Sequence, residues 1–158
     1  MIHPAFLSPL EVEVLDEALF RLVRPFKYQS AILGALLVIP EGFVTDLASI
    51  PRLPFVYWLY GGRARKAAVP HDFLYQVHPC DKATADWVFL EAMALIPELP
   101  VLARQAMYRG VWLAGGSAWT SGPGHSPACA LGSPSSRRWR FHTRRRWWAS
   151  RRWTSWRR

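Results

Sequence analysis

Residues 67–75 read AAVPHDFLY, and residues 85–89 read ADWVF. Together the two stretches hold a histidine, two aspartates and a tyrosine, the main concentration of reactive side chains in the sequence. On an α-helix, residues four apart share one face, so His71 and Tyr75 lie one above the other. A short connection makes successive helices antiparallel neighbours, so Asp86 approaches His71 from across the pair. The sequence therefore predicts a helix pair with a polar cluster at its centre.

Pro70 sets the predicted start of the first helix. A proline inside a helix costs about 3 kcal/mol, whereas a proline in the first turn loses no hydrogen bond. We therefore place Pro70 in the first turn, which puts His71 and Asp72 near the helix N-terminus, where a carboxylate or a bound anion is favoured. The helix ends before Pro79, and Asp81 is the predicted N-cap of the second helix.

The second and third helices follow from apolar periodicity. Asp86 lies at the edge of a single apolar stripe, which is typical of an amphipathic helix. A third helix is predicted over residues 101–114, between Pro100 and Gly115. The stripe of the second helix consists of Ala85, Val88, Phe89, Ala92, Met93 and Ile96.

The N-terminal part of the chain predicts strands. Short, partly alternating segments rich in β-branched and aromatic residues lie at 12–14 and 19–23. Residues 36–39 and 43–45 flank the tight-turn sequence of residues 40–42, Pro-Glu-Gly. The predicted fold class is α+β: a small N-terminal antiparallel β platform, about three α-helices, and then a disordered basic tail.

The positive charge is concentrated at the C-terminus. The chain of 158 residues is long enough for one domain and has a formal net charge of +9. Residues 1–119 hold ten Lys or Arg and eleven Asp or Glu, a charge of −1, whereas residues 120–158 hold ten Arg and no acid. We therefore expect a single globular domain over residues 1–119 and an Arg- and Trp-rich low-complexity tail over residues 120–158.

Two interpretations of the tail are open. An arm of arginine and aromatic residues neutralises phosphates and stacks on bases, which makes nucleic acid a partner through a genuine tail. Alternatively, the segment is translated out of frame, because Arg and Trp codons differ by one base and Lys, Asp and Glu are absent. We favour the second interpretation. Under both, a segment without periodicity or aliphatic core residues is expected to be disordered.

Cysteines and apolar runs indicate where the protein resides. Cys80 and Cys129 cannot build a disulfide framework, so a reducing cytoplasm is expected. The N-terminus lacks the basic start and apolar run of a signal peptide. The longest apolar run, residues 31–39, is well below the roughly 20 residues that span a bilayer. We therefore predict a soluble protein without a transmembrane segment.

Residues 42–52 (GFVTDLASIPR), with the motifs around His71 and Asp86, resemble the family known as domain of unknown function 1353, small proteins of bacteriophages and prophages. The resemblance extends from about residue 19 to Trp119 and stops there. It implies a phage or prophage gene, other phage proteins as partners, and a location in the host cytoplasm or the virion. It implies no established activity.

The helix pair also resembles that of the calcium-dependent secretory phospholipases A2. There a helix with His-Asp-x-x-Tyr, here His71, Asp72 and Tyr75, packs against a helix with Asp-x-x-Phe, here Asp86 and Phe89. The resemblance implies that His71 is a general base, Asp86 orients its imidazole, Asp72 binds Ca²⁺ and Tyr75 supports the site. The glycine-rich calcium loop and the disulfides of those enzymes have no counterpart in this sequence.

The remaining candidate residues lie in the first of these motifs. Asp46 is predicted to bind a metal together with Asp72, with Ca²⁺ as the candidate ion. Thr45, Ser49 and Arg52 are predicted to support the site. The structural alternative is that Asp46 caps backbone N–H groups in a turn and that Arg52 neutralises a carboxylate.

Two functions fit this set of residues. The first is a metal-assisted hydrolase of a lipid or another cell-envelope ester or amide, with His71 and Asp86 as the catalytic pair. The second is a non-enzymatic phage component of head or tail assembly, in which the same polar cluster joins the helix pair to the β platform.

The out-of-frame interpretation makes a prediction about mass. The product isolated from its native source should lack the mass of residues 120–158, and resequencing of the gene should find a frame change after Trp119. An intact native mass that includes Arg158 would contradict this interpretation.

Overall fold

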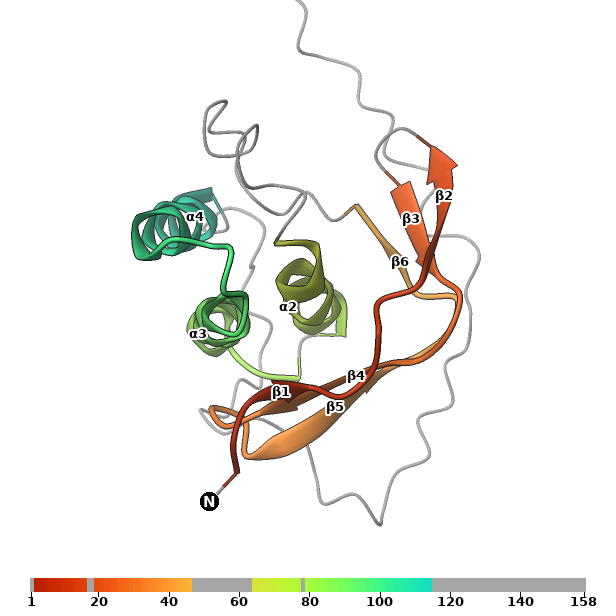
Figure 1. The fold of residues 1–158 in the computed structure, drawn as a ribbon, viewed down its shortest axis with the longest axis horizontal. Helices are drawn as coiled ribbons and strands as arrows, with labels where there is room; N and C mark the ends of the chain where they lie inside the picture. Colours follow the sequence, from red (N-terminus) through yellow and green to blue (C-terminus); the bar gives the residue numbers. More distant parts are fainter. Residues whose placement is uncertain (1, 17–18, 47–63, 78, 115–158) are drawn as a thin grey trace, which may run out of the picture.

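The protein has an α+β fold in which the strands come first and the helices follow. The computed structural model describes residues 2–16, 19–46, 64–77 and 79–114. Within these residues, six strands form two antiparallel three-stranded sheets, followed by three helices (Figure 1), which confirms the predicted fold class. The elements are β1 (Ala5–Phe6), β2 (Val12–Asp16), β3 (Leu19–Leu22), β4 (Phe26–Ser30), β5 (Ala35–Ile39), β6 (Val44–Thr45), α2 (Arg65–Val77), α3 (Lys82–Ala94) and α4 (Val101–Ala114).

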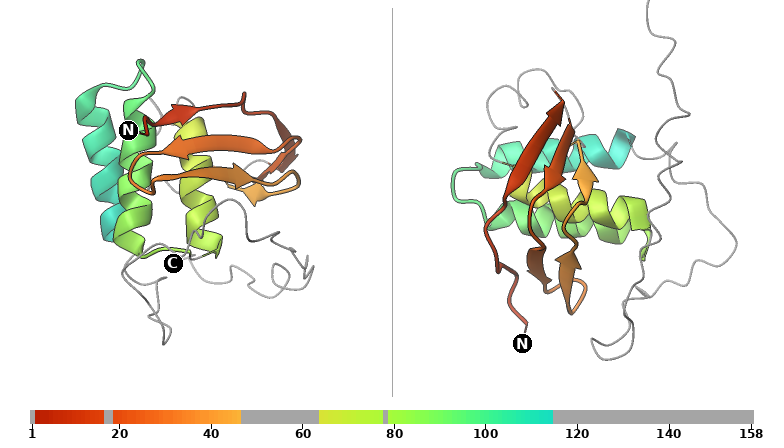
Figure 2. Two further views of the ribbon diagram at one scale, coloured as in Figure 1. Left: turned by 90° about the horizontal axis from the view of Figure 1, so that it is seen from below. Right: turned by 90° about the vertical axis from the view of Figure 1, so that its right-hand side faces the viewer.

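The two sheets are halves of one bent ribbon. Three chain segments each give one strand to each sheet, so the order is β1-β4-β5 in one sheet and β2-β3-β6 in the other. The segments therefore keep the same neighbours along the whole ribbon (Figure 2). Between its two strands each segment contains a proline, Pro9, Pro25 or Pro40. Proline has no N–H to give to the ladder, so one sheet ends there and the chain can turn into the next.

Backbone hydrogen bonds hold the ribbon together across the bend. The N–H of Leu22 donates to the carbonyl of Phe43 at 2.9 Å, and the N–H of Gly42 donates to the carbonyl of Leu22 at 2.8 Å. The N–H of Phe43 donates to the carbonyl of Pro40 at 3.3 Å, which closes the predicted turn. Gly42 has a φ of +80°, a conformation that glycine adopts without strain.

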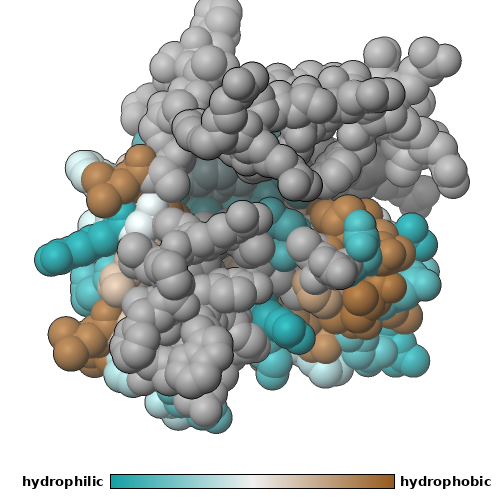
Figure 3. All heavy atoms as spheres, turned by 90° about the horizontal axis from the view of Figure 1, so that it is seen from above, coloured by the Kyte–Doolittle hydropathy of each residue, from teal (hydrophilic) through white to brown (hydrophobic). Residues whose placement is uncertain are grey.

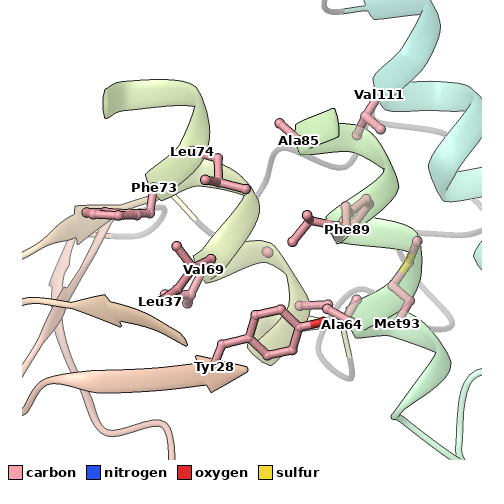
Figure 4. Close-up of a cluster of buried hydrophobic side chains, with 14 of the residues drawn as sticks. Tyr28, Leu37, Ala64, Val69, Phe73, Leu74, Ala85, Phe89, Met93 and Val111 are labelled. Carbon is pink, nitrogen blue, oxygen red and sulfur yellow. The ribbon is translucent and has the colours of Figure 1, made fainter. Parts of the chain in front are cut away.

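One face of the β1-β4-β5 sheet is buried beneath the helices. Phe26 and Tyr28 of β4 are buried and alternate with more exposed residues, as do Leu37 and Ile39 of β5. This alternation is typical of an antiparallel sheet with one face toward the core. Figure 4 shows Tyr28 and Leu37 rising from the sheet toward the helices, with Val69 of α2 above Leu37.

The predicted start of α2 is wrong. α2 begins at Arg65, so Pro70 lies inside the helix rather than in its first turn. The proline deprives the helix of one hydrogen bond and disfavours it by about 3 kcal/mol. Residues 67–69 are fully buried in the core, and the apolar surface that they remove from water offsets this loss. His71 therefore lies at the middle of the helix, too far from the N-terminus for the helix dipole to favour an anion there.

The other two helices agree with the sequence prediction. The Oδ1 of Asp81 accepts a hydrogen bond from the N–H of Thr84 at 2.7 Å, so Asp81 is the N-cap of α3. All six residues of the predicted apolar stripe are buried, but α3 ends at Ala94, so Ile96 lies beyond the helix. α3 lies between α2 and α4 (Figure 2). None of the described helices has the length and hydrophobicity needed to cross a bilayer.

Glu91 of α3 fastens the turn between β4 and β5 to the helices. Its Oε1 accepts hydrogen bonds from the hydroxyls of Tyr28 and Ser30, each at 2.7 Å. Its Oε2 accepts from the backbone N–H groups of Ala31 and Ile32 at 3.1 and 3.0 Å. Burial and the Glu91 carboxylate raise the pKa of Tyr28 far above its ordinary value, so the phenol remains a donor. One carboxylate therefore satisfies two turn N–H groups that have no partner in the β ladder.

Replacing Glu91 by alanine should lower the free energy of unfolding by about 2–4 kcal/mol, because the donors lose a charged acceptor. Tyr28→Phe, which removes a single donor, should cost about 1 kcal/mol. Glu98→Ala, at an exposed position, is the control and should change the value by less than about 0.5 kcal/mol. Urea unfolding measures all three, and equal effects of the two glutamate variants would show that Glu91 does not hold the turn.

Candidate active site

His71 of α2 and Asp86 of α3 form a buried pair. The Nε2 of His71 lies 3.0 Å from the Oδ1 of Asp86, as the antiparallel helix pair requires. His71 is 1% exposed, and Asp86 has no exposed surface. The imidazole also packs against two aromatic rings, with centroids 4.3 Å from that of Tyr75 and 4.9 Å from that of Phe89. Packing and hydrogen bonding together fix the orientation of the ring.

Asp86 is the acceptor at the centre of the cluster. The hydroxyl of Tyr75 donates to its Oδ1 at 2.7 Å, and the Nζ of Lys82 donates to its Oδ2 at 2.5 Å. The same Nζ donates to the carbonyls of Val111 and Trp112 in the last turns of α4, at 3.3 and 3.2 Å. One carboxylate and one ammonium therefore join three helices. Lys82 was not predicted as a site residue, although its place four residues before Asp86 on one helix is a signal for an ion pair.

Asp72 joins α2 to β6. The hydroxyl of Thr45 donates to the Oδ2 of Asp72, and the Nε2 of Gln76 donates to the carbonyl of Val44 at 3.2 Å. The Oδ1 of Asp72 lies 3.8 Å from the Nδ1 of His71. This separation is too long for a hydrogen bond but short enough for a strong interaction between charges. Asp72 therefore faces the ring nitrogen that Asp86 does not contact.

The two ring nitrogens of His71 have different environments. A carboxylate only accepts hydrogen bonds, so the Nε2 carries the proton that bonds to Asp86. In neutral His71 the Nδ1 then holds a lone pair. The Nδ1 is buried and has no hydrogen-bond partner in the part of the chain that the structure describes. A buried basic nitrogen in this position is suited to accept a proton from a substrate or a water molecule.

Burial and neighbouring charges oppose each other in setting the pKa values. Burial by itself lowers the pKa of His71, but the carboxylates of Asp72 and Asp86 outweigh it and raise the pKa above its ordinary 6.5. Burial by itself raises the pKa of Asp86, but hydrogen bonds from His71, Lys82 and Tyr75 outweigh it and lower the pKa. Burial and Asp86 raise the pKa of Tyr75, which stays protonated. The cluster thus stabilises an imidazolium beside an ionised carboxylate.

A pocket of about 170 Å³ adjoins this cluster. The two predicted metal ligands, Asp46 and Asp72, both line it, and so do the predicted supporting residues Thr45 and Tyr75. His71 is not among its lining residues, but Asp72 borders both the pocket and the Nδ1 of His71. Within the described residues, no group of three or more His, Cys, Asp or Glu is arranged to hold a metal ion. The pocket wall is completed by Leu19, Val44 and Gln76.

Most of the predicted site residues therefore come together around one pocket and one buried pair. Two predicted supporting residues, Ser49 and Arg52, lie outside the described residues, as does the tail of residues 120–158. The proximity of the other six is a finding, whereas their catalytic and metal-binding roles stay predictions. These six are Thr45, Asp46, His71, Asp72, Tyr75 and Asp86.

The fold and the cluster define a small α+β protein in which a bent β ribbon packs on a helix pair with a buried His–Asp pair. Residues 20–111 match the family model described as protein of unknown function (DUF1353), and the chain belongs to that family. The predicted family resemblance is thereby confirmed. The searches of curated proteins and of solved structures give no match. Phage origin and likeness to phospholipases A2 stay predictions.

The pKa shifts predict how His71→Gln changes stability with pH. His71 has a raised pKa when folded, so its contribution is fully present below pH 6.5 and is lost as pH rises through the raised value. Asp86 has a lowered pKa, so its contribution is present above pH 3.8 and is lost as pH falls through the lowered value. Urea unfolding of the wild type and of His71→Gln should give the largest difference in the free energy of unfolding between pH 3.8 and 6.5. A loss that does not depend on pH would contradict the assigned shifts.

Proposed function

We propose that this protein is a hydrolase of a lipid or another ester- or amide-containing component of the cell envelope, with His71 as its general base. One observation carries the proposal. The Nε2 of His71 is fixed by the buried Asp86, while its Nδ1 is a basic nitrogen without a hydrogen-bond partner in the described residues. A positioned imidazole with one nitrogen held by a carboxylate and the other open for a proton is suited to general-base catalysis.

The proposed reaction moves one proton through the imidazole. The Nδ1 accepts a proton from water as the water oxygen attacks the carbonyl carbon of the substrate. Asp86 stabilises the imidazolium that forms, and Lys82 and Tyr75 keep Asp86 ionised by donating to it. The imidazolium then gives its proton to the leaving alcohol or amine as the C–O or C–N bond breaks. The products are an acid and the leaving group, and His71 is neutral again.

Asp72 connects this chemistry to the pocket. Its carboxylate lines the pocket and lies 3.8 Å from the Nδ1 of His71. The route proposed for water therefore passes this side chain, and water reaches the Nδ1 when the Oδ1 of Asp72 turns aside. Because the two oxygens of a carboxylate turn together, this rotation also moves the Oδ2 of Asp72 relative to the hydroxyl of Thr45 that donates to it. The exposed Asp46 lines the same pocket.

A divalent cation fits this pocket in part. Asp46 and Asp72 offer carboxylate oxygens, and Thr45 and Gln76 offer a hydroxyl and an amide oxygen, which are the ligands that Ca²⁺ prefers. Calcium takes about six to eight oxygen ligands, more than two carboxylates supply. We therefore propose Ca²⁺ binding at Asp46 and Asp72 as a separate property and assign no step of the reaction to the metal.

A second candidate function is that of a non-enzymatic phage component of head or tail assembly. The observation that favours it is the burial of the whole cluster, with His71 only 1% exposed. Buried polar groups that hydrogen-bond across elements often serve to fix one arrangement of those elements. In this proposal Asp86 and Lys82 hold the helices together, and Asp72 and Thr45 hold α2 to the ribbon.

Hydrolysis assays with His71→Gln separate the two functions. Glutamine can still donate to Asp86 but cannot act as a base, so the variant should lose release of fatty acid from phospholipid vesicles by at least about a hundredfold. In the wild type, kcat/KM should rise with pH through a pKa above 6.5, because the neutral imidazole is the active form. His3→Gln, at an exposed histidine, is the matched control and should keep full activity.

Absence of hydrolysis by the folded wild type, on phospholipid and on simple ester and amide substrates, would overturn the enzyme proposal. If His71→Gln also unfolds at a clearly lower temperature than His3→Gln, the structural function is favoured.

The calcium proposal is tested by thermal unfolding. Millimolar Ca²⁺ should raise the Tm of the wild type by a few degrees, because a ligand that binds only the folded state stabilises it. Asp46→Asn should abolish the shift, whereas Glu41→Gln, at another exposed acid, should not. An equal shift in all three proteins would show that Ca²⁺ binds elsewhere, and no shift in the wild type would exclude the site.

A further inference from the structure

The outer side of α4 carries large apolar side chains at both ends of the helix, with the exposed Gln105 and Arg109 between them. Ala103, Met107 and Val111 are buried in the core and form one helical stripe. On the other side of the helix, Leu102 is 84% exposed and Leu113 is 72% exposed. Large apolar side chains gathered on the solvent side of a surface helix often mark an interaction site. The outer side of α4 therefore has the composition of a binding surface rather than of a solvated one.

The exposed apolar side chains of α4 form one surface with a neighbour from α3. At 100° per residue, the side opposite the buried stripe holds Val101 and Leu102 at one end of α4 and Trp112 and Leu113 at the other. Trp87 of α3 is half-exposed and extends this surface, with its ring centroid 5.2 Å from that of Tyr108. Figure 3 shows separate hydrophobic areas on its left-hand side, where α4 lies, with hydrophilic surface between them. We call this surface the α4 patch; it consists of Trp87, Val101, Leu102, Trp112 and Leu113.

The charge of α4 indicates what the patch binds. The helix contains no acid and two arginines, of which the partly buried Arg104 donates from its Nη2 to the carbonyl of Ile96 at 3.3 Å. Arg109 is exposed and falls on the same side of the helix as Leu102 and Leu113. Tryptophan is enriched at the boundary between lipid and water, and basic residues are attracted to anionic headgroups. Leucine, tryptophan and arginine on one helix side without an acid are complementary to an anionic bilayer surface.

We propose that the α4 patch docks this protein on the surface of an anionic phospholipid bilayer, with the leucine and tryptophan side chains inserted among the headgroups. The pocket beside the cluster lies between α2 and the strands β3 and β6, on the other side of α2 from the α4 patch, so the docking proposal does not depend on the pocket. Lys82 donates both to Asp86 and to the carbonyls of Val111 and Trp112, so the C-terminal end of the patch is bonded directly to the His71–Asp86 cluster. Only the role of the lipid as a substrate rests on the proposed function.

Depth measurement at single positions tests the docking surface. The Arg-rich residues after 119 also attract anionic lipid, so a local readout is needed rather than binding of the whole chain. Leu113→Cys and, as control, Val14→Cys on β2 are made in a Cys129→Ser background and labelled with a fluorophore. Both positions are well exposed, whereas Cys80 is buried. Vesicles of phosphatidylcholine with phosphatidylglycerol carry a nitroxide quencher on the lipid.

The label at position 113 should be quenched on these vesicles and the label at position 14 should not. Replacing Leu102 and Trp112 together by glutamine should weaken binding of the labelled protein by at least about tenfold, because apolar surface no longer leaves water. Equal quenching at both positions, or none at position 113, would overturn the proposal. Shielding of position 113 in the absence of lipid, with dimers in sedimentation, would assign the patch to a second copy of the chain instead.

The same experiment keeps docking separate from catalysis. His71→Gln should bind the vesicles like the wild type, because His71 is buried and lies outside the α4 patch. Quenching at position 113 without release of fatty acid by the wild type would refute the proposed hydrolysis of phospholipid while supporting docking. Release of fatty acid without quenching would refute docking alone.

Discussion

The buried carboxylate of Asp86 is the constraint on which the arrangement of the helices depends. An ionised group with no contact to water is costly unless several donors compensate for the lost hydration. Here His71 and Tyr75 approach from α2 and Lys82 from the same helix. Since Lys82 also donates to the last turns of α4, the position of one charge limits where all three helices can lie.

α3 is the element through which this constraint reaches the rest of the fold. One of its carboxylates, Asp86, faces the other helices, and a second, Glu91, faces the turn of the β ribbon. Between them the apolar stripe of the helix supplies non-directional burial, which brings layers together but does not fix their relative rotation. The two carboxylates supply the directional contacts. Burial thus brings the layers together, and the hydrogen bonds of the two carboxylates fix their relative orientation.

The sequence predicted the elements better than it predicted the contacts between them. Helix periodicity and capping identified α3 and α4, because Asp81 and the apolar stripe act within one element. The start of α2 was missed since a local rule about Pro70 was overridden by tertiary burial of residues 67–69. His71 and Asp86 could be paired from helix geometry. Glu91 could not be assigned from sequence, because its partners lie about sixty residues away along the chain.

The bends of the β ribbon have a consequence for register. A slip of one residue in a strand turns every side chain to the opposite face, and strands as short as those of this ribbon offer few pairs to resist it. Pro25 directly precedes β4 and Pro40 directly follows β5, so a slip of one residue in either segment can bring a residue without an N–H into the ladder. These prolines therefore also disfavour the wrong strand register, because a misaligned pairing loses hydrogen bonds as well as core packing.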